Sequence, residues 1–248
     1  MGDMAHPVSP ERALAAKLIE SLGIATASDH FAAKEFFELT LAAMPADGSL
    51  PTDSAQLTGI RVAQEGLHQL RKHRRGLTED GVLWIGRPDF LSDDRLQGIR
   101  EELESRRPLA FEHRMGQFLC AGGEAVTHLL ESKELHGLVE SFVGPLTSKR
   151  QASCLYYDRE GACIRPHVDT DLFCVNANLI VEHTGYTERR SQLIVYPLGG
   201  QPRPVVLSPG ELVLFYADCI VHARTPLIAR ERMRVISFGF QPEKEFHK

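Results

Sequence analysis

The hydrophobic pattern of this chain changes from a helical period to a strand period near residue 150. Before that point apolar residues recur every three or four positions, and after it short apolar runs alternate with turn residues. The pattern predicts helices over 10–22, 28–44, 55–75, 93–107 and 133–143. It predicts strands over 82–85, 154–157, 172–181, 192–198, 205–207, 211–216 and 233–240. Helices followed by six or more short strands predict an α+β fold, a β-sandwich or jelly roll with helices packed on its outer face.

Capping and turn signals support several of these boundaries. Ser9, Ser92 and Ser132 each precede a helical pattern and can accept a hydrogen bond from its first turn. Ser208-Pro209-Gly210 places proline and glycine at the central positions of a type II turn. We therefore expect the strands on either side of this turn to meet there.

Length and composition limit the class of protein. The chain has 248 residues and a net charge of −5, with no apolar run long enough to span a bilayer and no signal-peptide pattern at its start. We expect one catalytic domain over 1–248, with a helical region over about 1–80 and a jelly-roll core over about 81–248. We also expect a cytoplasmic protein without a membrane partner. The five cysteines lack CxxC spacing, which favours reduced thiols over a disulfide framework.

The charge balance makes a nucleic acid an unlikely partner, because acidic side chains outnumber basic ones. One basic run, Arg71 to Arg75, departs from this balance. We interpret it as a solvated helix end, with an anion site as the alternative.

The stretch from Gly161 to Asp169 contains residue types that bind metals. In an extended strand, residues two apart point to one face, so His167 and Asp169 project together. His222 follows a later apolar strand and offers a second imidazole. Two histidines and one carboxylate on one side of a cation leave open positions and suit Fe(II) in oxygenases. The alternative is a surface strand with two polar residues and a core histidine.

Iron needs an electron source to use oxygen, and a 2-oxo acid could fill two of the open positions. Its far carboxylate needs a cationic partner, for which a guanidinium fork is best suited. Arg232 and Arg234 follow His222 by ten and twelve positions and share one face of the last strand. Asn176 and Asn178 alternate along another strand; they could donate to the carboxylate or serve in strand-edge hydrogen bonds.

About a third of the chain, from Leu155 to Phe240, resembles the Fe(II)/2-oxoglutarate-dependent dioxygenases and, within them, the prolyl-hydroxylase-like branch. The resemblance is carried by five features in order: Gly161, Pro166-His167-Val168-Asp169, the stretch from Ser208 to Phe215, His222 and Arg232. The family's fold is a double-stranded β-helix, a variant of the jelly roll. This agrees with the fold predicted from the strand pattern.

The resemblance implies three iron ligands: His167, Asp169 and His222. It implies that Arg232 binds the distal carboxylate of 2-oxoglutarate, with Arg234 as the alternative, and that Tyr157 contacts this cosubstrate. The implied cofactors are Fe(II), 2-oxoglutarate and O₂.

The reaction implied by the resemblance is hydroxylation of an unactivated C–H bond, coupled to conversion of 2-oxoglutarate to succinate and CO₂. A compact chain suits a small-molecule substrate, such as an amino acid or a biosynthetic intermediate. Two alternatives remain. One is a hydroxylase of protein side chains, in which the loop 183–190 clamps a peptide. The other is a non-catalytic, cupin-like metal-binding module.

Overall fold

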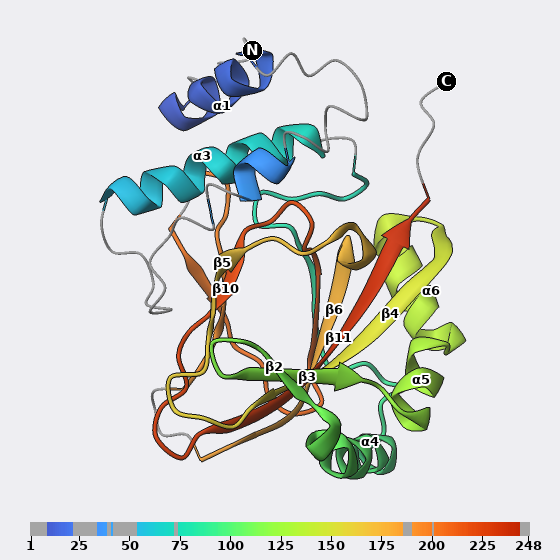
Figure 1. Cartoon of the computed structure of the whole chain (residues 1–248). Helices are drawn as coiled ribbons and strands as arrows, with labels where there is room; N and C mark the ends of the chain where they lie inside the picture. Colours follow the sequence, from blue (N-terminus) through green and yellow to red (C-terminus); the bar gives the residue numbers. More distant parts are fainter. Residues whose placement is uncertain are drawn as a thin grey trace.

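The computed structural model describes residues 9–21, 34–38, 41, 54–71, 74–185, 190–199 and 201–243 (Figure 1). Its labelled α-helices are α1 (Pro10–Ser21), α3 (Ser54–Leu70), α4 (Asp93–Arg106), α5 (Glu124–Leu130) and α6 (Lys133–Val143), and residues 34–38 are also helical. Two short 3-10 helices are η1 (Arg107–Leu109) and η2 (Asp171–Phe173). The strands are β1 (Val82–Gly86), β2 (Phe111–Arg114), β3 (Gln117–Ala121), β4 (Leu146–Tyr157), β5 (Ile164–His167), β6 (Val175–Thr184), β7 (Leu193–Val195), β8 (Arg203–Val205), β9 (Leu212–Tyr216), β10 (His222–Arg224) and β11 (Arg232–Pro242).

The strands form two antiparallel sheets. The larger sheet has seven strands in the order β1-β9-β6-β11-β4-β3-β2, and the smaller has four in the order β5-β10-β7-β8. A cavity between them is lined by side chains from both sheets. The predicted α+β fold with a jelly-roll core is thus confirmed.

Helices cover the larger sheet and one end of the sandwich. In Figure 1, α4, α5 and α6 lie along the outer side of the larger sheet, while α1 and α3 lie beyond its upper end. All five residues of strand β9 are buried, as is typical of a strand that is covered on both faces. Among the described residues, no helix combines the length and the apolar character needed to cross a membrane.

The capping predictions and the predicted turn type are confirmed, but the flanking strands β8 and β9 lie in different sheets and do not pair as expected. The Oγ atoms of Ser9, Ser92 and Ser132 each accept a hydrogen bond from the backbone N–H three residues later, at 3.1, 3.2 and 3.2 Å. Gly210 has a φ of +88°, and the N–H of Glu211 donates to the carbonyl of Ser208 at 2.9 Å. This hydrogen bond and the positive φ of Gly210 define a turn of the predicted type II form.

Several predicted boundaries were wrong. The segment 172–181 begins as η2 before it becomes β6, and β4 starts eight residues earlier than the strand expected at 154. The short elements β2, β3, β10 and α5 were not predicted. They are too short for a hydrophobic period to distinguish them from loops. The helix predicted over 28–44 lies largely outside the described residues.

The basic run beyond α3 binds a buried carboxylate of this chain. Arg71 Nε and Arg74 Nη2 donate to Asp218 Oδ2 at 3.2 and 2.7 Å, and Asp218 is fully buried. The interpretation of a solvated helix end is therefore wrong for these two arginines, since Asp218 needs a cationic partner in the core. Lys72 and His73 lie outside the described residues.

Gly239 allows η2 to pack directly on β11, and we expect Gly239→Ala to destabilise the protein. An added Cβ would lie 2.5 Å from Phe173 Cδ1 and 2.7 Å from the carbonyl oxygen of Leu172. Such overpacking costs about 1–3 kcal/mol of unfolding free energy, measurable by denaturant titration. Gly137 of α6 has open space around it, so the control Gly137→Ala should instead stabilise by about 0.5–1 kcal/mol. Equal stability of Gly239→Ala and the wild type would contradict this packing argument.

Candidate metal centre and pocket

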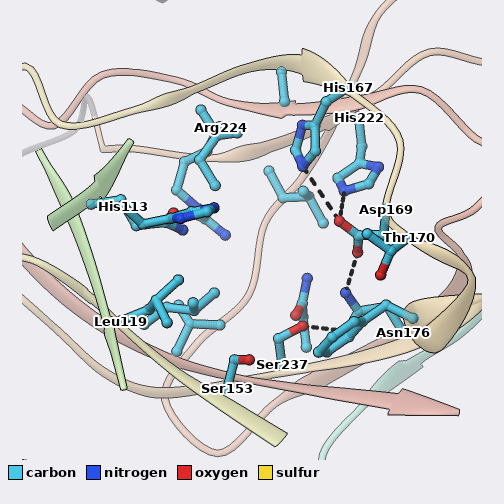
Figure 2. Close-up of a pocket in the computed structure, with 18 of the residues that line it drawn as sticks. His113, Leu119, Ser153, His167, Asp169, Thr170, Asn176, His222, Arg224 and Ser237 are labelled. Carbon is cyan, nitrogen blue, oxygen red and sulfur yellow. Dashed lines mark hydrogen bonds and ion pairs between the residues drawn. The ribbon is translucent and has the colours of Figure 1, made fainter. Parts of the chain in front are cut away.

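The cavity between the two sheets has a volume of about 360 Å³. Figure 2 shows His167, His222 and Asp169 converging at one end of it, with Arg224 extending into it from β10, the strand that also carries His222. The larger sheet contributes alternate residues of its central strands, among them Ser153, Leu155 and Tyr157 of β4. This alternation places polar and apolar side chains at successive positions along the cavity wall.

Three potential metal ligands come together from two strands of the smaller sheet. His167 of β5 and His222 of β10 are direct partners in the antiparallel register, and their ring centroids lie 4.3 Å apart. Asp169 follows β5, and its Oδ1 lies 3.5 Å from His167 Nε2 and 3.8 Å from His222 Nε2. The ligand atoms of all three residues lie within 4.8 Å of one another.

Backbone carbonyls orient both imidazoles. The Nδ1 atoms of His167 and His222 lie 2.9 Å from the carbonyl oxygens of Arg165 and Ile220. A carbonyl can only accept, so each Nδ1 carries the hydrogen and each Nε2 lone pair faces Asp169. Burial, with His167 close by, lowers the pKa of His222 to about 4. The ring of His222 is therefore neutral at pH 7, as a metal ligand must be.

One carboxylate oxygen of Asp169 accepts a hydrogen bond, which leaves the other oxygen to bind a metal ion. Oδ2 accepts a hydrogen bond from Asn176 Nδ2 at 2.7 Å, and Asn176 Oδ1 accepts one from Ser237 Oγ at 2.8 Å. Burial alone would raise the pKa of Asp169, but the two imidazoles and Asn176 hold it below its ordinary value. Asn176 thus orients the carboxylate of Asp169, a role that the sequence analysis did not predict for it. Asn178 lines the same cavity.

This donor set fits a divalent cation. When both imidazoles are neutral, their Nε2 lone pairs and a carboxylate oxygen face one another, and a positive charge placed among them stabilises this arrangement. Two histidines and a carboxylate bound through one oxygen match the facial arrangement used by non-haem Fe(II) oxygenases. The residues present therefore fit iron.

Arg224 is a cation in this cavity that the sequence analysis missed. It is 6% exposed, its Cζ lies 5.4 Å from the ring centroid of Tyr157, and its Nη1 lies 3.3 Å from Met233 Sδ. In the described part of the chain, no carboxylate forms an ion pair with it. Burial lowers the pKa of Arg224 from its ordinary value, against the opposing effects of Tyr157 and Glu231. A buried guanidinium in this state would be stabilised by an anionic ligand.

Tyr157 lies in the cavity as expected from the resemblance. It is 1% exposed, and its hydroxyl accepts a hydrogen bond from Gln117 Nε2 at 2.7 Å. Burial raises the pKa of Tyr157, so the hydroxyl keeps its proton at neutral pH and can donate it in a hydrogen bond.

The structure does not bring Arg232 and Arg234 into the cavity. Val235 and Ser237 of β11 line it, so the even-numbered residues of this strand point to the other face of the sheet. Arg232 is exposed, and Arg234 forms ion pairs with Glu104 and Glu182. The rule that paired His167 with Asp169 could have found Arg224, because Arg224 stands two positions after His222 on the same strand.

A second cavity of about 650 Å³ adjoins the first. It shares His167, Ile164 and Thr170 with the metal cavity, and the helical segment near residue 35 contributes Glu35 and Glu38 to its wall. Its position gives a larger ligand room beside the candidate metal site.

No family model matches the chain, and a search of curated proteins found no match. Solved structures do match. A Pseudomonas putida prolyl-4-hydroxylase is 19% identical with a TM-score of 0.55, over 65% of this chain and 93% of that one. A Trichoplax adhaerens prolyl hydroxylase, solved with a hypoxia-inducible-factor peptide fragment, is 17% identical with a TM-score of 0.56, over 78% and 95%.

A third match is HygX from Streptomyces hygroscopicus, solved with nickel, 2-oxoglutarate and hygromycin B. It is 14% identical with a TM-score of 0.54, over 66% of this chain and 84% of that one. At these identities the comparisons show the fold, which is that of prolyl hydroxylases and other 2-oxoglutarate oxygenases. The family resemblance predicted from the sequence is confirmed at this level.

Proposed function

We propose that this chain is an Fe(II)/2-oxoglutarate-dependent dioxygenase that hydroxylates an unactivated C–H bond of a small molecule. The observation that carries the proposal is the convergence of three ligand atoms, from His167, Asp169 and His222, in a cavity that also holds the buried cation Arg224. A bound Fe(II) ion would account for the three converging ligand atoms, and an anionic cosubstrate such as 2-oxoglutarate would account for the buried Arg224.

His167, Asp169 and His222 would hold the metal. Fe(II) bound there supplies oxygen activation, with 2-oxoglutarate as the source of electrons and succinate and CO₂ as its products. The chain's contribution is geometric: the carbonyls of Arg165 and Ile220 fix the imidazoles, and Asn176 limits Asp169 to one ligating oxygen. All three side chains line the cavity, so a cosubstrate bound there would lie beside the metal that they would hold.

Arg224 is the residue we assign to the distal carboxylate of 2-oxoglutarate. It lies on the same strand face as His222, two residues away, which separates the two Cα atoms by roughly 6.6 Å along the strand. Tyr157 lies beside it and can donate a second hydrogen bond. Leu155 and Val235 form an apolar wall suited to the methylene carbons between the two carboxylates.

A small substrate fits the space that the described residues enclose. Cavities of about 360 and 650 Å³ lie within the range of small-molecule sites. His167 lines both cavities, so the larger one adjoins the proposed metal site. Hydroxylation of a protein side chain is the alternative, favoured by the prolyl hydroxylase solved with a peptide.

Anaerobic titration of the chain with Fe(II), with and without 2-oxoglutarate, tests the proposal. A keto acid chelated to Fe(II) gives a visible charge-transfer band, so the band should appear only when both are present. Metal binding without the band would instead support a non-catalytic, cupin-like module.

Succinate formation distinguishes the two substrate classes. With Fe(II), 2-oxoglutarate and O₂ supplied, a mixture of free amino acids and other small metabolites should raise succinate production above the level without substrate. Stimulation only by a protein fraction depleted of small molecules would support the protein-hydroxylase alternative and reject the small-molecule substrate.

A further inference from the structure

Two buried polar side chains join the N-terminal helices to the segments that carry the metal ligands. We use the name N-terminal layer for the helical residues 34–38 together with α3. Lys34 is 5% exposed and Gln64 of α3 is 1% exposed. Neither lines the metal cavity, yet each reaches the backbone beside a proposed ligand.

Lys34 holds the segment that contains Asp169. Its Nζ donates to the carbonyl oxygen of Asp169 at 3.2 Å and to Asp171 Oδ1 at 2.8 Å. On the other side, the N–H of Asp169 donates to the carbonyl of Ala217 at 2.7 Å. The backbone of Asp169 is therefore fixed from both sides, and Lys34 supplies one of them.

Gln64 holds the segment that leads into His222. Its Nε2 donates to the carbonyl of Cys219 at 2.8 Å, and its Oε1 accepts from the N–H of Val221 at 2.6 Å. Ile220 lies between these residues, and its carbonyl is the acceptor for His222 Nδ1. Through the N–H of Val221, Gln64 thus fixes the peptide group that contains the carbonyl orienting the His222 ring, and through the carbonyl of Cys219 it fixes the preceding peptide group.

A purely structural role does not account for the placement of both contacts. The desolvation cost of burying Lys34 is offset by ion pairs with Asp171 and Glu38 at 2.8 and 3.7 Å, and an apolar residue could close the same interface without either charge. Lys34 instead bonds the backbone of Asp169, a proposed ligand, and Gln64 bonds the backbone within three residues of His222, another proposed ligand. Hydrogen bonds that orient metal ligands typically raise metal affinity 10–100-fold.

We infer that Lys34 and Gln64 are positioning residues for the metal centre, so that the N-terminal layer completes the site. This inference depends on the proposed metal-binding function. It also predicts reciprocity, because a layer that favours metal binding must itself be stabilised when metal binds.

Cobalt(II) binding to the full-length chain tests the inference without turnover. We expect Lys34→Met and Gln64→Leu each to raise the Co(II) dissociation constant about tenfold or more, by calorimetry, and to change the visible ligand-field spectrum. Lys34→Arg should restore affinity to near the wild-type value, because it keeps donors for both oxygens. Exposed residues give matched controls: Lys149→Met and Gln97→Leu should bind Co(II) as the wild type does.

Amide hydrogen exchange on the wild-type chain gives a second measurement that needs no variant. Co(II) should slow exchange in α3 as well as in the segments carrying the ligands. The inference is overturned if wild-type protein binds Co(II) and both variants bind it within twofold. If the variants do not fold, unchanged exchange in α3 on Co(II) binding overturns it. Failure of the wild type itself to bind Co(II) would reject the proposed metal function.

Discussion

Replacing Arg224 with methionine should raise the dissociation constant for 2-oxoglutarate at least a hundredfold while leaving metal affinity near the wild-type value. Removing one partner of a buried charge pair costs about 3–5 kcal/mol, and each 1.4 kcal/mol is a factor of ten in affinity. The charge-transfer band, titrated with 2-oxoglutarate in the presence of saturating Fe(II), measures the change. Methionine keeps most of the side-chain volume, and the lost guanidinium has no carboxylate partner within the described chain, so the thermal midpoint should not fall.

Arg232→Met and Arg234→Met are the matched controls for this prediction. Both arginines lie at the start of β11. Arg232 is exposed, and Arg234 forms ion pairs with Glu104 and Glu182. Each variant should bind 2-oxoglutarate within about threefold of the wild type, since both side chains lie across the sheet from the cavity. If one of them loses the cosubstrate and Arg224→Met does not, the anchor lies on β11 and our assignment of Arg224 is wrong.

The convergence of the three candidate metal ligands was predictable because it depends on a local rule and a motif. Residues two apart on a strand share a face, which joined His167 to Asp169 from the sequence alone. The same rule did not show which face of β11 meets the cavity. Both faces of that strand carry apolar residues, since one packs against helices and the other lines the cavity, so alternation there does not identify the inner face.

The contribution of the N-terminal helices could not be predicted from the sequence. They were expected only to cover the sheet, and the amphipathic pattern of a helix gives no information about a distant partner. Lys34 lies 135 residues from Asp169, and Gln64 lies 155 residues from Cys219. Contacts at such separations depend on the tertiary arrangement. A buried polar residue within an apolar helix face, such as Gln64, is the only local signal of them.

Replacing Asp169 with alanine should abolish hydroxylation and raise the Co(II) dissociation constant by more than a hundredfold. Two histidines alone form a weak site for Fe(II) or Co(II), because the carboxylate supplies the only negative charge in the ligand set. The substitution removes the hydrogen bond from Asn176 Nδ2 but leaves the backbone contacts of Asp169 with Ala217 and Lys34, which do not involve its side chain. The thermal midpoint of the metal-free variant should therefore stay within a few degrees of the wild type.

The comparison of Asp169→Ala with Asp94→Ala separates loss of a ligand from loss of a surface charge. Asp94 is exposed in the first turn of α4, where its removal costs only about 0.3–1 kcal/mol and leaves the cavity unchanged. Succinate formation and Co(II) binding should persist in Asp94→Ala and be absent or very weak in Asp169→Ala. Normal turnover by Asp169→Ala at full metal occupancy would mean that His167 and His222 take their third ligand from elsewhere. Asn176 could not replace it, because a neutral amide does not supply the negative charge that Asp169 brings to the cation.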